Sequence, residues 1–385
     1  MKHRTFAGLS LLASLVLGVV PARAQHHSSD CINLRLQGSL LDYTQNGGRD
    51  CRIFSPALCE YRDLYVYLPP GYDPKGRYPI LIWLHSYTDD ECEFAKHVVP
   101  VIDRAVAAGE LPPLVVAAPD GSLNGDHHVL SLGSWFVNSP RGRFADFVSE
   151  DVLKFMEDNF AVCRDRAGRA IAGFSMGGFG AYSLGMKHSD KFKVVGGIAP
   201  AVNPRFVGPC NRYLEDFVPG YPYLRGDYES FEKVGEFYGG ALKIRAWMIV
   251  KPVFGRGREA VERVSEDNPI ELLERLNIQP GQQDYYVGYG NADEMNIGAQ
   301  VDSFLYVAQQ RGIAVESRSY PCGQHDIPFM VSAMPDFLAW LKSRLSCPAE
   351  PGTKLSGVLQ ATGLSTSLEQ AIRSSHDASL ILPRP

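Results

Sequence analysis

The 385-residue sequence lacks the features that define several large classes of protein. Its lysines and arginines form no basic stripe and its formal net charge is −5, which argues against a nucleic-acid partner. None of its eight cysteines stands in the C-x-x-C spacing of zinc sites. After the N-terminus, no stretch approaches the roughly 20 apolar residues of a membrane helix. We therefore expect a globular protein without stable membrane insertion.

The N-terminal 24 residues have the pattern of a signal peptide. Lys2 and Arg4 are basic, residues 6–20 are apolar, and Ala22-Arg23-Ala24 has the small-x-small pattern of a cleavage site. An anchoring helix is the alternative, but about 15 apolar residues are short for a bilayer. The sequence thus predicts a signal peptide over residues 1–24, cleavage after Ala24, and a secreted or periplasmic protein.

In an oxidising compartment, cysteines tend to form disulfides, although sequence does not determine their pairing or the oligomeric state. Cys51 and Cys59 are close enough in sequence to close one loop. Cys322 stands three residues before His325, where a disulfide would stiffen the loop. A free buried thiol remains the alternative for each cysteine: Cys31, Cys51, Cys59, Cys92, Cys163, Cys210, Cys322 and Cys347.

Apolar runs alternate with helical patterns along most of the chain, which predicts an α/β fold with a doubly wound, mostly parallel sheet and helices on both faces. We expect strands at Leu64–Leu68, Ile80–Leu84, Leu114–Ala118, Ala170–Gly173, Val194–Ile198, Asp284–Val287 and Ala314–Tyr320. We expect helices at Glu93–Ala108, Phe144–Asn159, Gly178–Lys187, Ile297–Arg311 and Ile327–Leu345.

Two segments depart from this alternation. Residues 203–267 are rich in aromatic residues, glycine and proline, and we interpret them as an insertion above the sheet. Residues 347–385 are rich in Ser, Thr and Gly, which is typical of a flexible tail. The predicted organisation is a signal peptide, an N-terminal extension over 25–61, an α/β domain over 62–346 that contains the insertion, and the tail.

The pattern Gly173-Phe174-Ser175-Met176-Gly177 is the strongest chemical signal. It follows an apolar strand and precedes a helix start of small residues, as the G-x-S-x-G turn of a serine nucleophile does. Glycines on both sides of Ser175 avoid clashes with the neighbouring strand and helix. The alternative is a structural glycine-rich turn with an idle serine. The context predicts Ser175 as a nucleophile, with the N–H of Met176 as an oxyanion donor.

A serine nucleophile needs a base, and the base needs an orienting carboxylate. The expected chain order is serine, acid, histidine. His325 follows the last predicted strand and precedes the last long helix, whereas His188 ends the serine's own helix and His376 lies in the tail. We therefore predict His325 as the base, against the alternative of a surface histidine.

The acid is expected in the glycine-rich loop after the preceding strand. That loop contains Asp293 and Glu294 side by side. Asp293 is the prediction because a shorter side chain is the usual orienter, and Glu294 is the competitor. The alternative role for either residue is to cap the following helix.

A second oxyanion donor is expected in the loop after Leu81–Leu84. Its backbone N–H groups near Ser86 and Tyr87 would face Ser175. His85, at the end of that strand, is interpreted as a structural residue rather than a ligand.

The motifs at 65–72, 85, 118–121, 173–178, 293 and 323–326 together resemble the Putative esterase family of α/β-hydrolases. That family contains esterase D, feruloyl esterases, enterochelin esterases and mycolyltransferases, and the resemblance spans Arg62 to Leu345. It implies Ser175 as nucleophile, His325 as base, Asp293 as acid, and the amides of Met176 and Tyr87 as oxyanion donors. Two positions differ from the family pattern, Ser86 after His85 and Gln324 before His325.

The resulting hypothesis is a secreted serine carboxylic ester hydrolase that acts through an acyl-Ser175 intermediate, without a metal or organic cofactor. The expected substrate is a small-molecule or polysaccharide-linked ester. Ser86, Trp135 and Phe136 are predicted to contact it, although an aromatic cluster is more often core. Two alternatives are an acyltransferase with the same triad and a sugar or lipid hydroxyl as acceptor, and a non-catalytic binding protein with this fold.

Overall fold

The computed structural model describes residues 29–46, 48–125, 132–220, 224–228, 232–238 and 241–348. The predicted signal peptide and the predicted tail from residue 349 onward lie outside the described residues. Among the described residues, none of the helices combines the length and the hydrophobicity that a membrane span requires.

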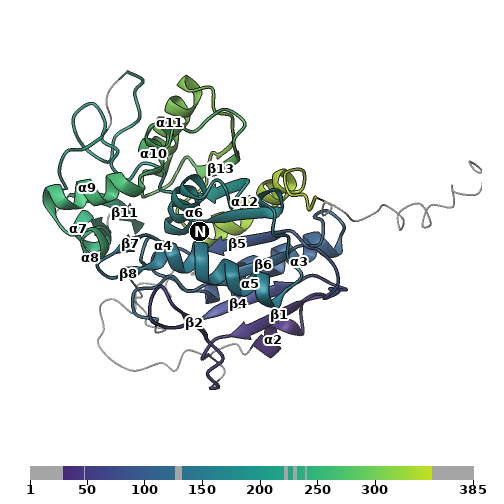
Figure 1. The fold of residues 1–385 in the computed structure, drawn as a ribbon. Helices are drawn as coiled ribbons and strands as arrows, with labels where there is room; N and C mark the ends of the chain where they lie inside the picture. The colour runs from purple at the N-terminus through teal and green to yellow at the C-terminus, as the bar shows by residue number, and fades with distance from the viewer. Residues whose placement is uncertain are drawn as a thin grey trace, which may run out of the picture. The chain divides into compact units, whose positions relative to one another are not determined.

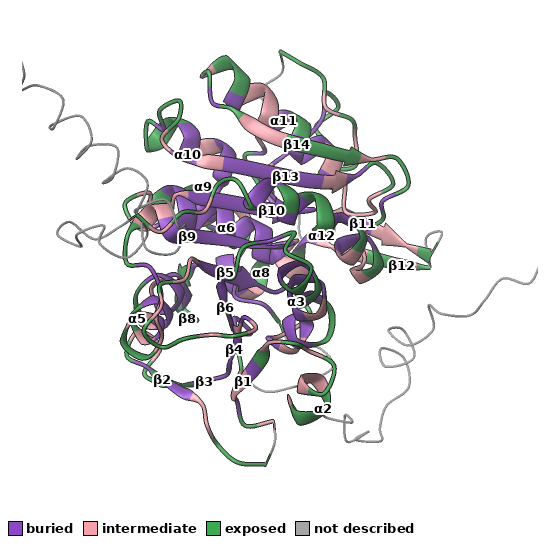
Figure 2. Cartoon of the chain, turned by 90° about the vertical axis from the view of Figure 1, so that its right-hand side faces the viewer, coloured by how far each residue is buried: buried purple, intermediate pink, exposed green. Residues whose placement is uncertain are grey.

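The core of the fold is a sheet of eight strands in the order β1-β4-β6-β5-β9-β10-β13-β14. Figure 1 labels β1, β4, β6, β5 and β13 of this sheet, and Figure 2 labels every strand from β1 at the bottom to β14 at the top. Strands β6, β5, β9, β10, β13 and β14 are parallel to one another, and β4 is antiparallel to both β1 and β6. The strands are β1 (Ser39–Tyr43), β4 (Leu64–Leu68), β5 (Ile80–Leu84), β6 (Val115–Pro119), β9 (Arg169–Phe174), β10 (Val194–Ile198), β13 (Asp284–Gly290) and β14 (Val315–Tyr320).

Apolar runs become the central strands because those strands are covered on both faces. Every residue of β5, β6, β9 and β10 is buried, whereas β14 at the edge has no buried residue (Figure 2). The predicted mostly parallel sheet is confirmed, and β4, β5 and β10 begin and end at the predicted residues.

Helices cover both faces of the sheet. Successive residues of a strand point to opposite faces, and on β10 the position of Gly196 faces Phe337 of α12 while Gly197 faces Tyr182 of α6. Helices α12 and α6 therefore lie on opposite faces, and α3 packs beside α12. The helices outside the insertion are α2 (Ser29–Asn33), η1 (Phe94–Val98), α3 (Val99–Ala107), α4 (Phe144–Asp146), η2 (Phe147–Val152), α5 (Leu153–Asn159), η3 (Arg166–Gly168), α6 (Met176–Lys187), α10 (Pro269–Arg275), α11 (Ile297–Gln310) and α12 (Ile327–Leu341).

Strand β1 has no counterpart among the predicted strands. Only Leu40 of its five residues is buried, so it shows no apolar run, and its place is set by pairing with β4. Residues 25–61, predicted as an extension before the domain, therefore contribute an edge strand to the main sheet. They also contain β2 (Ile53–Ser55), which forms a hairpin with β3 (Glu60–Arg62).

The described residues of the segment 203–267, predicted as an insertion, contain a small sheet and three helices. These are β11 (Lys233–Phe237), β12 (Leu242–Arg245), α7 (Ala246–Ile249), α8 (Lys251–Phe254) and α9 (Gly257–Asp267). A further hairpin, β7 (Asn138–Ser139) with β8 (Gly142–Arg143), precedes this segment. The segment bonds to the loops that follow β5 and β13, through Tyr87 Oη to the Met248 carbonyl and the Glu236 N–H to the Glu294 carbonyl. These contacts therefore lie at the carboxyl edge of the sheet.

The disulfide connects Cys163 with Cys347, 184 residues apart in sequence, with their Cα atoms 5.8 Å apart. Cys347 is the first residue of the predicted flexible tail, so this position is tied to the domain. Cys51, Cys59 and Cys322 are free thiols. The β2–β3 hairpin excludes a Cys51–Cys59 disulfide. Cys59 lies in the turn of the hairpin, whereas Cys51 lies before the start of β2, so several residues of extended chain separate the two thiols.

Candidate active site

Ser175 lies in the turn between β9 and α6, at the carboxyl end of a central strand. Its backbone has φ 54° and ψ −113°, a conformation that a non-glycine residue rarely adopts. The turn is held by the Ser175 N–H, which donates to the Ile198 carbonyl at 3.0 Å. Between Arg169 and Met186 every residue except Ser175 is buried. The strained turn thus presents one hydroxyl at an otherwise closed surface.

The two glycines of the motif are required by close backbone approach. A Cβ at Gly173 would lie 2.4 Å from the Leu84 carbonyl oxygen, and one at Gly177 would lie 1.9 Å from the same atom. Both obstacles are backbone atoms at the end of β5, so no side-chain rotation relieves them. The local sequence G-x-S-x-G therefore lets β9 turn into α6 directly beside β5.

His325 reaches Ser175 from the loop between β14 and α12. Its Nε2 lies 2.8 Å from Ser175 Oγ, although 150 residues separate the two in sequence. The Phe174 ring stacks on the imidazole, with the ring centroids 5.4 Å apart. Asp326, the N-cap of α12, accepts the Phe329 N–H at 2.8 Å and so fixes the end of the loop.

Asp293 completes the arrangement from the loop between β13 and α11. Its Oδ2 lies 2.7 Å from His325 Nδ1. Its Oδ1 accepts the N–H groups of Met295 at 2.8 Å and of Ile297 at 3.3 Å. One carboxylate thus holds the imidazole and also caps α11, so the capping role that the sequence left open coexists with the contact to histidine.

Glu294 has a different partner. Its Oε2 accepts the backbone N–H of His325 at 2.8 Å, whereas the imidazole contacts Asp293. The geometry thereby separates the two adjacent carboxylates: Asp293 contacts the ring and Glu294 the backbone of the same residue.

The electrostatic environment makes the His325 imidazole a stronger base. Burial, the largest single influence, lowers the pKa of His325, but the carboxylates of Asp293, Glu294 and Asp326 together outweigh it and raise the pKa above its ordinary value of 6.5. The Asp293 side chain is 1% exposed and the imidazole 11% exposed. Water therefore screens this pair little, and a small part of the imidazole remains accessible beside Ser175.

The predicted oxyanion donors lie on α6 and on the loop after β5. Met176 is the first residue of α6, so its N–H has no partner within the helix. In the other loop, His85 Nδ1 lies 2.8 Å from the Ser86 carbonyl oxygen. Gly121 donates its N–H to His85 Nε2 at 2.8 Å, so the ring proton is on Nδ1 and is donated to Ser86. In a trans peptide the N–H points opposite to the carbonyl, so this bond orients the Tyr87 N–H away from His85.

Ser86 is held by a buried carboxylate. Its N–H and its hydroxyl both donate to Glu93 Oε2, at 3.0 and 2.6 Å. The contact between Ser86 and substrate stays a prediction. Glu93 is a residue that sequence analysis missed, because a carboxylate in an acidic run usually faces solvent. Burial, together with the nearby Asp89, raises the pKa of Glu93 to about 8.

Trp135 and Phe136 are also parts of the core. Phe136 is fully buried against His85 and α6, and Trp135 is 6% exposed. The indole of Trp135 packs on Phe179 and Phe254 and donates its Nε1–H to the Ile249 carbonyl at 3.0 Å. The Trp135 side chain thus joins the sheet domain to the insertion, and the contact of Trp135 and Phe136 with substrate stays a prediction.

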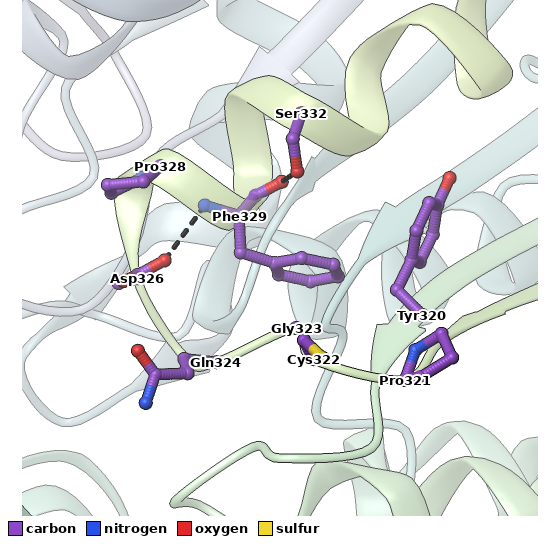
Figure 3. Close-up of a pocket in the computed structure, with 9 residues that line it drawn as sticks. All are labelled: Tyr320, Pro321, Cys322, Gly323, Gln324, Asp326, Pro328, Phe329 and Ser332. Carbon is purple, nitrogen blue, oxygen red and sulfur yellow. Dashed lines mark hydrogen bonds between the residues drawn. The ribbon is translucent and has the colours of Figure 1, made fainter.

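An open pocket of about 570 Å³ lies against the His325 loop. Figure 3 shows the rings of Tyr320 and Phe329 turned toward each other in it, with centroids 5.4 Å apart. Gln324 and Asp326 line it, but Ser175 and His325 do not. The pocket therefore lies beside the His325 loop and does not include the Ser175 hydroxyl.

One cluster of potential metal ligands occurs in the described part of the chain, at Asp90, Glu91 and Cys92. All three side chains already have partners within the protein, and Cys92 Sγ donates to Glu91 Oε1 at 3.6 Å. Asp90 Oδ1 accepts the Cys92 N–H at 2.8 Å, and Glu91 Oε1 accepts from Asn46 Nδ2 at 2.9 Å. The cluster therefore serves to hold the loop after β5.

A mostly parallel sheet with helices on both faces, and a serine on the strand–helix turn at its carboxyl edge, define an α/β-hydrolase. Solved structures support this fold class. The chain is similar to a ferulic acid esterase (TM-score 0.58, 21% identity, 80% of this chain and 100% of that one) and to the S-formylglutathione hydrolase of Agrobacterium tumefaciens (TM-score 0.57, 18% identity, 81% and 97%).

The chain belongs to the Putative esterase family, whose model matches residues 55–342, and the family predicted from the sequence is confirmed. Among curated relatives, an S-formylglutathione hydrolase of Arabidopsis thaliana is 28% identical over 39% of this chain and 56% of its own length. Esterase Rv1288 of Mycobacterium tuberculosis is 26% identical over 68% of this chain and 51% of its own length. The chain thus spans about half the length of the curated relatives it matches.

Proposed function

We propose that this protein is a serine carboxylic ester hydrolase whose catalytic residues are Ser175, His325 and Asp293. One observation carries the proposal: Ser175 Oγ, the imidazole and the Asp293 carboxylate form a continuous chain of hydrogen bonds, with separations of 2.8 and 2.7 Å. Membership of an esterase family supports the same reaction class.

In the first half of the reaction, His325 Nε2 accepts the proton of the Ser175 hydroxyl as Oγ attacks the ester carbonyl carbon. The negative charge that develops on the carbonyl oxygen is stabilised by the N–H groups of Met176 and Tyr87. Collapse of the tetrahedral intermediate breaks the bond to the alcohol, which leaves with the proton from His325. The acyl group remains on Ser175.

In the second half, His325 accepts a proton from water, whose oxygen attacks the acyl-Ser175 carbonyl. The carboxylic acid leaves and the proton returns to Ser175 Oγ. Asp293 stabilises the imidazolium in both halves and keeps the proton of the neutral ring on Nδ1, so that Nε2 can accept.

We also propose that the protein is exported. The basic, apolar and small-x-small segments of residues 1–24 support this, and so does the Cys163–Cys347 disulfide, since disulfides persist in oxidising compartments. Mass spectrometry of protein recovered from the periplasm or medium would then give a chain that starts at Gln25.

The reaction is tested by Ser175→Ala, with Ser183→Ala as the matched control. Ser183 is on the same helix, α6, and its hydroxyl donates to Asp267 at 3.1 Å, away from the chain of catalytic hydrogen bonds. With p-nitrophenyl acetate and a panel of short acyl, feruloyl and acetyl-sugar esters, Ser175→Ala is expected to lower kcat by about 10⁴- to 10⁶-fold. Turnover by Ser175→Ala equal to that of Ser183→Ala would contradict the mechanism.

A further inference from the structure

The loop over residues 291–296, called here the acid loop, carries Asp293 and is held by the insertion. Tyr213 Oη donates to the Met295 carbonyl at 2.8 Å. Asn296 Nδ2 donates to the carbonyls of Tyr213 at 2.5 Å and Glu215 at 3.0 Å. The Glu236 N–H donates to the Glu294 carbonyl at 3.2 Å. Two separate parts of the insertion, around residues 213–215 and at β11, therefore bond to the three consecutive residues that directly follow the acid, Glu294 to Asn296.

The contact from Tyr213 leads to the carboxylate in two steps. The Tyr213 hydroxyl holds the Met295 carbonyl, and the Met295 N–H donates to Asp293 Oδ1 at 2.8 Å. The other oxygen, Oδ2, contacts His325. A shift of the Met295 backbone would therefore alter the hydrogen bond that sets the orientation of the carboxylate.

Tyr213 is itself fixed in place. Its side chain is buried and its ring lies beneath the Arg225 guanidinium, 5.6 Å from the centroid. Gln300 Nε2 donates to the hydroxyl at 2.6 Å, so the hydroxyl's own proton is available for Met295. Burial raises the pKa of Tyr213, and the hydroxyl remains a donor throughout the pH range of an assay.

Asn296, at the end of the acid loop, has φ 54° in the left-handed region. Such a conformation is retained when surrounding contacts over-determine it. The two carbonyls of the insertion that bind its side chain supply such contacts. The path of the acid loop is thus set partly by residues about 80 positions earlier in the chain.

We propose that Tyr213 is a positioning residue for the catalytic acid, and that through this one residue the insertion supports the chemical step of this esterase. The inference rests on the proposed function, in which Asp293 orients His325. It predicts that removal of one hydroxyl outside the triad weakens the chemical step without altering substrate binding.

Tyr228 supplies a matched control for Tyr213. Both tyrosines are buried in the insertion and both rings contact Arg225. The Tyr228 hydroxyl donates to the Pro204 carbonyl at 3.1 Å, so it holds the insertion together without contacting the acid loop. Tyr213→Phe and Tyr228→Phe each remove one buried hydroxyl, and only the first removes a bond to the acid loop.

The experiment compares kcat, KM, the pH profile of kcat/KM and the urea midpoint for the two variants in the full protein. One neutral hydrogen bond corresponds to roughly a 3- to 10-fold change in rate. Tyr213→Phe is expected to lower kcat by that factor with KM unchanged, and to move the acid limb of kcat/KM to lower pH, because Asp293 raises the pKa of His325 less when it is mispositioned. Tyr228→Phe is expected to lower the urea midpoint by about as much as Tyr213→Phe does, while kcat and the acid limb stay unchanged.

A double-mutant cycle with Asp293→Asn distinguishes positioning from general destabilisation. If Tyr213 acts through the acid, Tyr213→Phe has no further effect on kcat in the Asp293→Asn background. The inference would be overturned if Tyr213→Phe lowered kcat by the same factor in the Asp293→Asn background as in the wild type. It would also be overturned if the kcat of Tyr213→Phe equalled that of Tyr228→Phe. If Tyr213→Phe does not fold, Asn296→Gly takes its place, because glycine tolerates the left-handed backbone and the change removes both side-chain bonds from the acid loop to the insertion. A kcat of this variant equal to that of Tyr228→Phe would likewise overturn the inference.

The failure of this inference is distinct from that of the proposed function. Full activity of Ser175→Ala and Asp293→Asn would refute the function. Loss of activity in both, with Tyr213→Phe unaffected, would leave the function in place and refute only the role of Tyr213.

Discussion

The adjacent carboxylates Asp293 and Glu294 offer the sharpest test of the catalytic geometry. Asp293→Asn and Glu294→Gln each replace a carboxylate by an amide of the same shape, one residue apart. Asp293 lies 2.7 Å from the His325 imidazole, whereas Glu294 accepts the His325 backbone N–H at 2.8 Å. The two variants therefore remove the same charge from different sides of one histidine.

The magnitude for Asp293 follows from the 2.7 Å separation. At an effective dielectric constant of about 20, opposite charges at this distance attract by about 6 kcal/mol, which corresponds to roughly 10⁴-fold in rate. An amide NH₂ facing Nδ1 also favours the tautomer with its proton on Nε2, which cannot accept from Ser175. Asp293→Asn is thus expected to lower kcat by about 10⁴-fold.

Glu294→Gln retains an amide oxygen that can accept the His325 N–H, so the backbone contact persists. Loss of its charge removes a contribution to the raised pKa of His325 that is smaller than that of Asp293. The expected fall in kcat is about 3- to 10-fold, the scale of one perturbed hydrogen bond.

The pH profile provides the second readout. His325 must be neutral to act as a base, so the acid limb of kcat/KM follows its pKa, which is raised above 6.5 in the intact protein. In Asp293→Asn, burial is no longer outweighed and the limb is expected below pH 6.5. In Glu294→Gln the acid limb is expected to shift in the same direction, but by less. A larger loss of kcat and a larger shift in Glu294→Gln than in Asp293→Asn would refute the assignment of the acid.

Two further predictions concern the supports of the site. Gly177→Ala places a Cβ 1.9 Å from the Leu84 carbonyl oxygen, and we expect it to lower the free energy of unfolding by about 2–4 kcal/mol and to abolish turnover. Gly298 lies on α11, and an alanine Cβ there would be 3.9 Å from its nearest neighbours, which are on β13. Gly298→Ala is expected to be neutral or stabilising in the same urea titration, and equal behaviour of the two variants would contradict the steric account. Glu93, with its pKa raised to about 8, favours the fold below its ordinary pKa of 4.5 and loses that contribution as pH rises toward 8. Glu93→Gln keeps an oxygen for both Ser86 donors, so it is expected to retain activity. Its free energy of unfolding is expected to fall less between pH 5 and 8 than that of the wild type. If the free energy of unfolding falls equally in both proteins, Glu93 is excluded as the cause of the fall.

The sequence alone was sufficient where the constraint is local. A serine flanked by glycines between an apolar strand and a small-residue helix predicted the turn at Ser175, because the close approach to Leu84 tolerates no Cβ at either flank. Chain order then predicted His325, since the carboxyl ends of parallel strands meet at one edge of the sheet. The structure brings these residues and Asp293 within hydrogen-bonding distance.

Only the tertiary structure decided the features that depend on which side of the backbone a residue faces. Trp135 and Phe136 have the composition of a binding wall, yet α6 and the insertion cover them. Asp293 and Glu294 are equivalent in sequence, and the path of the acid loop directs one to the imidazole and the other to the backbone. Contacts between residues far apart in the chain, such as Tyr213 with Met295, leave no periodic pattern, because folding alone brings them together.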